Sequence, residues 1–443
     1  MNGNSTIFME DILMIKASDF GFFPGNTPEK NSAALQMAAD IGGEIFVDGK
    51  GIADVVFPMM VGNDTTVIFE DGLFLRRNDS EKEHNGYAIV NRGAFTKTWN
   101  RNIKILGLKL ICNNVTCKGE GVKSDKCVPG LRGQIAFHYV KDLEIRDLEV
   151  TDLPKFDYCV HICTFENVLV ENAYIEGLKD GVHFGGGKNF TVRNCKFRTL
   201  DDAVALNAHD YSSGNPELGW IENGLIENCE DLSCKQLGFF SRILAGSWLN
   251  WHEGMMIRHS DTVVHNGRLY RAYMQADGRE YISVIPPTHT EGTVTLDGEI
   301  AWVMVQEGTH LNVGCRNITF RNITLESNRH TGFKLHFDNE APSHSVYPGS
   351  ILPVQENIVF ENVKVISREM KCLMRSNTPI KNVVMRNCDL AHSRMVIYRV
   401  DVPDVRYGKG DITLENLTYT PVEEKPMLIV ENGLDMDVVY KNN

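Results

Sequence analysis

A short motif recurs along most of this chain: an Asn or Asp, four residues of strand-like character, and usually a second Asn or Asp five positions after the first. Positions one and three after the first Asn are apolar in nearly every copy, whereas positions two and four carry many Thr, Glu and Arg. This alternation indicates a β-strand with one buried face. Nine copies are visible, at 102–107 (where Gly takes the last place), 142–147, 167–172, 189–194, 223–228, 317–322, 357–362, 382–387 and 411–416.

The spacing of the copies favours a right-handed parallel β-helix, an all-β solenoid. Spacings of 189 − 167 = 22 and 382 − 357 = 25 residues set the length of one coil, and larger gaps imply loops inserted at the corners. A propeller blade needs roughly 40 to 50 residues. Because a solenoid grows by stacking coils, 443 residues can form one long domain. Asn tolerates left-handed backbone angles, so we expect the second Asn to turn the chain and stacked Asn side chains to form an internal ladder.

The N-terminal region predicts a cap for the first coil. Thr27 is suited to be the N-cap of a helix with Pro28 at its first position, and the helix should stop at Gly42-Gly43 before a strand at 44–47. Without a cap, the first coil would expose its apolar floor and an unpaired edge. We therefore expect the solenoid to span 1–250 and 310–443, with the cap at about 17–50.

The long gap between the fifth and sixth copies predicts a small inserted β-module at 251–309. A hairpin is expected around Asn266-Gly267, followed by further short strands. Trp302 and Tyr270 admit two interpretations. They could stack on sugar rings from an exposed surface, or they could form the module's own small core.

Three aspartates stand out within two consecutive copies of the repeat. Asp180 and Asp202 are 202 − 180 = 22 residues apart, and Asp201 stands beside Asp202. If 22 residues make one coil, Asp180 and Asp202 lie on neighbouring strands about 4.8 Å apart. Like charges at that distance destabilise a sheet, which indicates a functional site, although an Asp before a strand also caps backbone N–H groups without any chemistry.

Several of these segments resemble the pectin-degrading right-handed β-helix superfamily, and within it glycoside hydrolase family 28, the polygalacturonases and their relatives. Asp19-Phe20-Gly21 followed by the segment 33–38 is similar to the superfamily's first motif. The family's Asn-Thr-Asp-Gly motif is matched at 178–181 and its Gly-Asp-Asp-Cys motif at 200–203. The resemblance implies that Asp180, Asp201 and Asp202 are the catalytic set.

By the family's pattern, Asp201 would be the general acid, and Asp180 and Asp202 would hold the water. An inverting mechanism is expected, with functional carboxyl groups about 6.5 to 9.5 Å apart. Two departures weaken the link to galacturonic acid itself. The family's Gly-His-Gly segment has no clean match, since Arg242 is the one strong polar group of that coil, and the family's Arg-Ile-Lys motif is replaced by Lys334-Leu335-His336.

Strand alternation supplies further candidates for substrate binding. If Val182 and Phe184 point inward, His183 points outward beside the aspartates, and His161 lies one coil earlier at 183 − 161 = 22 residues. The remaining candidates in this groove are Arg242, Lys334, His336 and, at its rim, His209. For each histidine, an exposed or loop-packed side chain without a binding role is the alternative.

Composition excludes some partners. The net charge of −13, without a basic block, argues against nucleic acid, and no run of about 18 apolar residues suggests a membrane span. Eleven scattered cysteines without CxxC pairs favour buried thiols, and no metal site or cofactor is expected. Residues 1–16 lack the pattern of a secretory signal, so a cytoplasmic protein is expected, or a secreted one if a leader precedes this sequence. The oligomeric state is left open.

These features predict a glycoside hydrolase with a carbohydrate substrate, including uronate-containing poly- or oligosaccharides. A polysaccharide lyase is the nearest rival enzyme, and it would need the aspartates to bind a metal such as Ca²⁺. An isomerase or transglycosidase could use the same scaffold. The non-enzymatic rival is a glycan-binding or tailspike-like adhesin, which the inserted module would suit.

Overall fold

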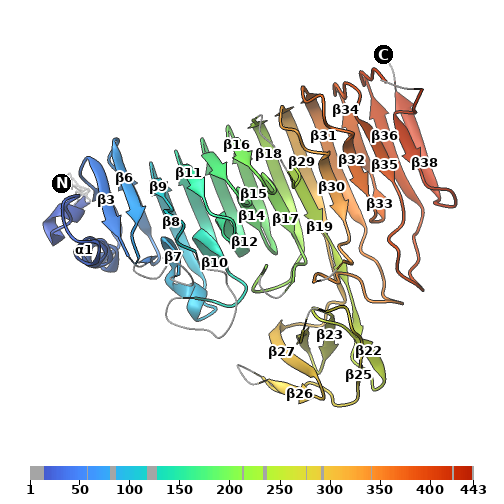
Figure 1. The fold of residues 1–443 in the computed structure, drawn as a ribbon, viewed down its shortest axis with the longest axis horizontal. Helices are drawn as coiled ribbons and strands as arrows, with labels where there is room; N and C mark the ends of the chain where they lie inside the picture. Colours follow the sequence, from blue (N-terminus) through green and yellow to red (C-terminus); the bar gives the residue numbers. More distant parts are fainter. Residues whose placement is uncertain are drawn as a thin grey trace, which may run out of the picture.

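The structure is a computed structural model that describes residues 14–56, 58–79, 86–116, 127–211, 214–232, 237–275, 277–290, 294–340, 342–421 and 424–441. Figure 1 shows a long stack of strands that runs from the helix α1 to β38, with a small group of strands projecting from one side. Residues 1–13 of the predicted first domain lie outside the described ranges. Within those ranges, no helix has the length and apolar character that a membrane span requires.

The stack is a parallel β-helix in which 29 strands join one sheet that wraps around the core. Three rows of strands form its sides, called rows A, B and C below. Row A carries the repeat and consists of β2 (Gly43–Val47), β5 (Thr65–Phe69), β8 (Asn100–Leu106), β10 (Gly133–Arg146), β12 (Tyr158–Glu171), β15 (Gly187–Arg193), β18 (Ile221–Asp231), β29 (Cys315–Leu325), β31 (Gln355–Val365), β34 (Val383–Arg386), β36 (Gly410–Glu415) and β38 (Met436–Lys441).

Rows B and C complete each coil. Row B consists of β3 (Gly51–Val55), β6 (Leu73–Arg77), β9 (Lys109–Ile111), β11 (Glu149–Leu153), β13 (Tyr174–Gly177) and β16 (Lys196–Thr199). Row C consists of β4 (Met59–Val61), β7 (Ile89–Asn91), β14 (Val182–Phe184), β17 (Val204–Asn207), β19 (Ser241–Leu244), β30 (Thr331–His336), β32 (Cys372–Ser376), β35 (Arg394–Ile397) and β37 (Leu428–Val430), with the first halves of β10 and β12 between β7 and β14. Two short strands, β1 (Ile15–Lys16) and β33 (Ile380–Lys381), pair with β2 and β31. The predicted right-handed parallel β-helix is confirmed.

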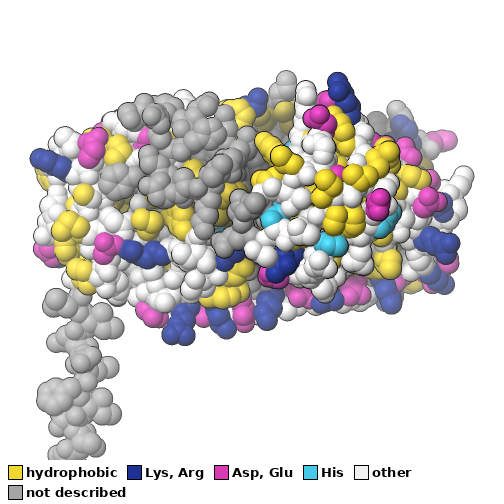
Figure 2. All heavy atoms as spheres, turned by 90° about the horizontal axis from the view of Figure 1, so that it is seen from below, with side chains coloured by type: hydrophobic (Ala, Val, Ile, Leu, Met, Phe, Trp, Pro, Cys, Tyr) yellow, Lys and Arg dark blue, Asp and Glu magenta, His cyan; other side chains and the backbone are white. Residues whose placement is uncertain are grey.

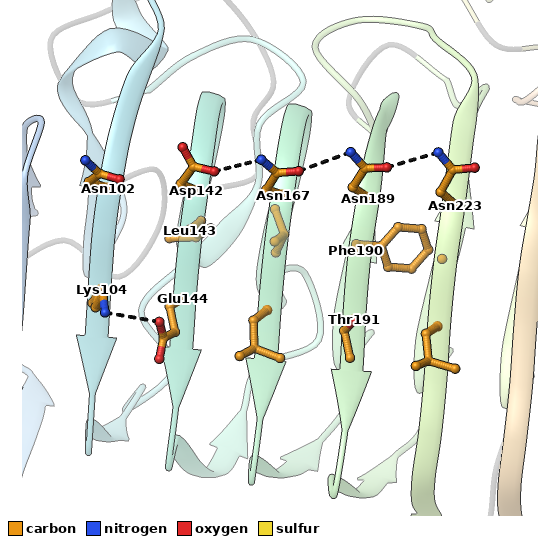
Figure 3. A pocket seen from close by; sticks show the side chains of 14 residues that line it. Asn102, Lys104, Asp142, Leu143, Glu144, Asn167, Asn189, Phe190, Thr191 and Asn223 are labelled. Carbon is orange, nitrogen blue, oxygen red and sulfur yellow. Dashed lines mark hydrogen bonds and ion pairs between the residues drawn. The ribbon is translucent and has the colours of Figure 1, made fainter.

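The Asn residues of the repeat adopt the left-handed angles that a tight bend between strands requires. Asn167, Asn189 and Asn223 have φ of 58°, 59° and 58°, and the second Asn of these copies has similar values. Their amides form the predicted ladder along row A (Figure 3): Asn189 Nδ2 donates to Asn167 Oδ1 at 3.1 Å, and Asn223 Nδ2 donates to Asn189 Oδ1 at 3.0 Å. The ladder continues through Asn317, Asn357 and Asn382.

The ladder is exposed, so the prediction of an internal ladder is wrong. Asn167, Asn189 and Asn223 lie at left-handed bends within β12, β15 and β18, where the side chain points away from the core, and all three reach solvent. The ladder borders an open hollow of about 560 Å³ on row A, which includes none of the predicted site residues.

Alternating charges form a second ladder along row A. At the fourth position of the repeat, strand pairing places Arg and Glu in strict alternation over eight neighbouring strands: Arg146, Glu171, Arg193, Glu227, Arg321, Glu361, Arg386 and Glu415. Arg193 Nε lies 2.6 Å from Glu171, and Arg386 Nε lies 2.9 Å from Glu361. A coil that paired with its second neighbour would face a like charge, so the pattern opposes wrong stacking.

The N-terminal cap forms as predicted. A short 3₁₀ helix, η1 (Ala17–Phe20), precedes α1 (Pro28–Ile41), whose N-cap is Thr27 and which ends at Gly42. The helix buries Ala34, Leu35, Ala38 and Ala39 against the first coil. A second 3₁₀ helix, η2 (Arg92–Phe95), lies between β7 and β8.

The segment inserted between β19 and β29 forms its own sheets beside row C (Figure 1). Its strands are β20 (Gly246–Ser247), β21 (Leu249–Asn250), β22 (Met255–Ile257), β23 (Thr262–His265), β24 (Arg268–Tyr273), β25 (Tyr281–Ser283), β26 (Thr295–Asp297), β27 (Ile300–Glu307) and β28 (Asn312–Val313). The predicted hairpin around Asn266-Gly267 joins β23 to β24. The domain boundaries themselves stay a prediction.

Burial decides between the two interpretations of the module's aromatic residues. Trp302 and Tyr270 are 0% exposed and pack together with Ile257 and Val263, so they form the module's core and cannot stack on a sugar. Tyr273, at 56%, is an exposed ring of the module. Figure 2 views the molecule from the side that carries the module, where hydrophobic side chains gather. The nine cysteines among the described residues are all buried.

Replacing Asn189 separates the two roles of the ladder. Asn189→Ala loses both the amide bonds and a side chain that tolerates left-handed angles, so we expect it to lower the free energy of unfolding by about 2 kcal/mol. Asn189→Gly keeps the backbone angle and loses only the amide, so it should cost less. Denaturant midpoints of the two variants measure the difference, and an Ala variant no less stable than the Gly variant would contradict this explanation.

Candidate active site

Strand pairing brings the three predicted aspartates together. β13 pairs with β16, and β14 pairs with β17. The turn between β13 and β14, which contains Asp180, therefore stacks on the turn between β16 and β17, which contains Asp201 and Asp202. The Gly181 N–H donates to the Asp202 carbonyl at 2.9 Å. A Cβ on Gly181 would lie 2.6 Å from the carbonyl oxygen of Ala203, so glycine permits this close stacking. One carboxylate oxygen from each of Asp180, Asp201 and Asp202 lies within 4.8 Å of the others.

The trio differs from the spacing expected for an inverting enzyme. One oxygen of each carboxyl group lies within 4.8 Å of the others, which is closer than the interval of about 6.5 to 9.5 Å expected between the functional carboxyl groups. A separation below about 5.6 Å still lets one water accept or donate a hydrogen bond of about 2.8 Å to each of two carboxyl groups.

Exposure distinguishes the three carboxyl groups. Asp180 and Asp202 are 3% and 2% exposed, whereas the Asp201 side chain is 33% exposed. Solvent, and hence a ligand, reaches Asp201 first.

Lys179 supplies a positive charge within the trio. Its ammonium forms an ion pair with Asp201 Oδ2 and lies 3.6 Å from Asp180 Oδ1. Burial raises the pKa of Asp201, but the Lys179 ammonium, together with the Arg242 and Arg329 guanidinium groups, outweighs it and brings that pKa below its ordinary value. Asp201 is therefore ionised in the free protein.

Asp180 and Asp202 hold protons much more tightly. Burial raises the pKa of Asp202 to about 8, and the charges of Asp201 and Asp180 add to this effect. Burial also raises the pKa of Asp180 to about 7, although Lys179 partly offsets the shift. The free protein thus combines an ionised Asp201 with a protonated Asp202. The resemblance implies the reverse, an acid at Asp201.

A buried ion pair fixes the backbone of the turn that contains Asp201. Arg329 and Asp231 form an ion pair at 2.8 Å in which both side chains are 0% exposed. Arg329 Nη1 also donates to the Asp201 carbonyl at 2.8 Å, and its Nη2 donates to the Thr199 carbonyl at 3.2 Å. A buried ion pair adds little net stability, so fixing this turn is the clearest consequence of the arrangement.

His183 lies beside the trio, as predicted, but it does not line an open groove. Its Nδ1 lies 2.8 Å from Asp180 Oδ2, and the side chain is 0% exposed. The Tyr158 ring stacks on the imidazole at 3.9 Å between centroids, with the planes 10° apart. Burial lowers the pKa of His183 to about 3, so the ring is neutral.

His161 and His209 are buried as well. His161 pairs with His183 in register, and it accepts the Arg132 backbone N–H at Nδ1, at 3.1 Å, while its Nε2 lies 2.9 Å from Asn215 Oδ1. His209 is 1% exposed and packs near Trp248. None of the three histidines is placed to meet a ligand from solvent without movement of the chain that covers it.

The cationic candidates do line up along row C. Strand pairing places Ala205, Arg242, Lys334 and Arg375 side by side on successive strands. Burial lowers the pKa of Lys334 to about 8, with Arg242 adding to the effect. His336, two residues after Lys334, has a pKa lowered to about 2, first by burial and then by Lys334 and Arg242.

Arg242, Lys334 and Arg375 differ in their contacts. Arg242 Nη2 lies 2.8 Å from Asp338, whereas Lys334 and Arg375 have no carboxylate at ion-pair distance among the described residues. Lys334 and Arg375 instead lie over the rings of Phe239 and Tyr398, at 5.2 and 5.0 Å. The row can therefore accept an anionic group.

Sequence reasoning missed four of these groups. Lys179 is adjacent to Asp180 and could have been found by asking which cation lies nearest the trio. Arg375 follows Lys334 by 375 − 334 = 41 residues, because an inserted loop hides the coil spacing. Nothing local in the sequence points to Arg329 or Asp338, whose roles depend on contacts between coils.

The trio offers oxygens that could hold a metal ion, since carboxylates suit Ca²⁺ and Mg²⁺. The Lys179 ammonium already provides a cation to two of the three carboxyl groups. Without a metal, the arrangement can donate a proton from a neutral carboxyl and accept one at an ionised carboxylate, which is general acid–base chemistry.

No protein-family model matches the chain, and no curated protein matches it in sequence. Solved structures match it in fold. A family 28 exopolygalacturonase from Yersinia enterocolitica is 12% identical, with a TM-score of 0.48, over 97% of this chain and 78% of that one. A surface protein and adhesin of Streptococcus pneumoniae is 14% identical, with a TM-score of 0.45, over 97% and 100%.

A third solved structure, an endo-xylogalacturonan hydrolase from Aspergillus tubingensis, is 11% identical, with a TM-score of 0.40, over 94% of each chain. Identities this low decide nothing about activity, because one fold carries out unrelated functions.

The raised pKa values of Asp180 and Asp202 predict how stability depends on pH. The unfolded value is about 3.9, so both groups stabilise the fold below about pH 4, and this contribution is lost as pH rises through the folded values of about 7 and about 8. Asp202→Asn, which carries no charge, should therefore be more stable than the natural protein at pH 8 and should lose less stability between pH 4 and 8.

Asp201→Asn is the matched control, because this substitution should change the stability at neutral pH in the opposite direction. The Asp201 pKa is lowered, so its contribution is present at neutral pH and lost in acid, and this substitution should destabilise the protein at pH 7. Melting temperatures of both variants across pH 4 to 8 provide the measurement. An Asp202→Asn variant less stable than the natural protein at pH 8 would count against the buried, proton-holding carboxyl.

Proposed function

We propose that this chain is a glycoside hydrolase that cleaves a poly- or oligosaccharide by acid–base catalysis at Asp180, Asp201 and Asp202. The observation that carries the proposal is the trio itself, in which three carboxyl groups within 4.8 Å divide into one ionised and two proton-holding members. Glycoside hydrolysis needs both states in one site, an acid for the leaving oxygen and a base for water.

Substrate entry begins at Asp201, the exposed member, and displaces the Lys179 ammonium from it. Once the ammonium has left, the largest of the causes that held the Asp201 pKa low is gone, and a proton passes from Asp202 to Asp201. Asp201 then donates this proton to the glycosidic oxygen as the bond from that oxygen to the anomeric carbon breaks.

Asp202, now ionised, works with Asp180 on the water. The two hold one water between them, and Asp202 takes a proton from it as its oxygen bonds to the anomeric carbon. The step leaves Asp201 ionised and Asp202 protonated, which is the charge pattern of the free protein, so the cycle closes without any outside proton. A single displacement of this kind inverts the anomeric configuration.

The cations of row C favour an anionic saccharide as the substrate, such as one that contains uronate. Arg242 is occupied by Asp338, but Lys334 and Arg375 face aromatic rings and are the groups that a sugar carboxylate would meet. Hydrogen bonds to charged groups are stronger than neutral ones, so this row would favour acidic over neutral glycans.

The test is a panel of uronate-containing and neutral glycans, with new reducing ends measured and product configuration followed by proton NMR. We expect Asp180→Asn, Asp201→Asn and Asp202→Asn each to lower turnover by about 100- to 10,000-fold with the fold intact, as judged by circular dichroism. Full activity in any of the three would refute the role given to that residue.

The same assays separate the rival functions. An unsaturated product that absorbs in the ultraviolet and requires Ca²⁺ would make the protein a polysaccharide lyase. Glycan binding without any new reducing end, equal in the natural protein and in Asp201→Asn, would make it an adhesin.

A further inference from the structure

The inserted module contacts a segment that closes over the site. This segment, called the closing loop below, comprises Ala208–Tyr211 and Gly214–Gly219 and follows β17. Gln306 on β27 accepts the Leu218 backbone N–H at Oε1, at 2.7 Å, and donates to the Leu218 carbonyl from Nε2, at 3.0 Å. One module side chain thus holds both backbone groups of a single loop residue, as a neighbouring strand would.

A second module residue enters the same region. Arg271 on β24 is 4% exposed and lies in register beside Val303 of β27. Its Nη1 lies 3.5 Å from the Asn215 carbonyl. The charge of Asp210 acts on the Arg271 guanidinium, whose pKa burial lowers to about 10. Arg271 therefore places a buried positive charge behind the closing loop.

The closing loop in turn contacts the two histidines beside the trio. Asn215 Oδ1 lies 2.9 Å from His161 Nε2, and Asp210 Oδ2 lies 3.6 Å from His183 Nε2. His183 then contacts Asp180 at 2.8 Å through its other ring nitrogen. A continuous series of contacts therefore runs from the module, through the loop and an imidazole, to a carboxyl group of the proposed site.

The backbone fixes the proton position on one of these histidines. His161 Nδ1 accepts the Arg132 N–H, so it carries no proton, and Nε2 must carry the proton that is donated to Asn215. Loss of Asn215 would leave this buried N–H without its acceptor. The closing loop thus sets the hydrogen bonding of His161 and not only its burial.

The loop is also attached to the solenoid through Glu217. Glu217 accepts hydrogen bonds from Tyr139 at 3.0 Å and Thr164 at 2.9 Å, and it forms an ion pair with Lys97 at 2.8 Å. Lys97 also donates to the Val305 carbonyl of the module at 3.0 Å. The solenoid anchors Glu217 and also Asn215, whose Nδ2 donates to the Asn207 carbonyl at 2.7 Å, whereas Leu218 is held by the module.

We infer that the inserted module is a positioning element, in which Gln306 and Arg271 hold the closing loop so that Asn215 and Asp210 fix His161 and His183 beside Asp180. The effect of the module on catalysis rests on the proposed function. The contact between Gln306 and Leu218 does not depend on that function. The module is then part of the site's wall, and its removal would alter the site even though no module residue belongs to the trio.

The test compares two substitutions at adjacent positions of β27. Gln306→Ala removes both bonds to Leu218, and Glu307→Gln removes an exposed ion pair with Arg268, at 3.0 Å, on the same pair of strands. We expect hydrogen exchange of 214–219 to become about tenfold faster in Gln306→Ala and to stay unchanged in Glu307→Gln. Gln306→Glu, which keeps the acceptor for the Leu218 N–H, should restore part of the protection.

Two further measurements distinguish positioning from a general loss of stability. In Gln306→Ala, the pKa of Asp180, followed by carbon-13 NMR of its carboxyl group, should fall, because a looser loop admits water to Asp180 and removes part of the burial that raises this pKa. Nitrogen-15 NMR of His161 should show its Nε2 proton exchanging faster, while Glu307→Gln leaves both properties unchanged.

The outcomes separate this inference from the proposed function. If the natural protein cleaves no glycan, the proposed function fails, and the exchange and NMR data still decide the role of the module. Unchanged exchange and an unchanged His161 in Gln306→Ala would overturn the inference. Equal changes in Gln306→Ala and Glu307→Gln would overturn it as well, since they would reflect loosening of the whole module.

Discussion

The register between neighbouring coils is the constraint on which the rest of this structure depends. Backbone pairing alone does not fix it strongly, because every parallel strand of a solenoid resembles the next. Here two side-chain devices act along row A. The Asn ladder fixes the bends, since Asn167, Asn189 and Asn223 all sit at left-handed angles and hydrogen-bond one another. The alternating Arg and Glu residues make each coil complementary to its direct neighbour.

Register on row A is what assembles the site on row C. Once neighbouring coils are aligned, Asp180 and Asp202 must meet at the same turn, and Arg242, Lys334 and Arg375 must follow one another along the adjoining strands. Repulsion among the clustered aspartates, and among the clustered cations, opposes folding. The two ladders on row A contribute stability that offsets this repulsion. Burial then differentiates the carboxyl groups, because Asp180 and Asp202 lose water while Asp201 keeps both solvent and the Lys179 ammonium.

Features that repeat were predictable from the sequence, and features that depend on inserted chain were not. The solenoid, the capping helix, the hairpin at Asn266-Gly267 and the meeting of the aspartates follow from local patterns or from coil spacing. The alternation of charge was present in the sequence but shows its meaning only when strands are paired. The burial of His161 and His183 was missed because strand alternation says which side a residue faces and not what covers that side, and here the loop carrying Asp210 and Asn215 does.

A carbon-13 NMR titration of the aspartate carboxyl groups tests the central claim most directly, namely that coil stacking joins Asp180, Asp201 and Asp202 into one coupled unit. Asn substitution at each position assigns the three signals. We expect one carboxyl to titrate below the ordinary aspartate value of about 3.9 and two to titrate close to neutrality, with each substitution shifting the remaining two. Three independent titrations near 3.9 would contradict the account.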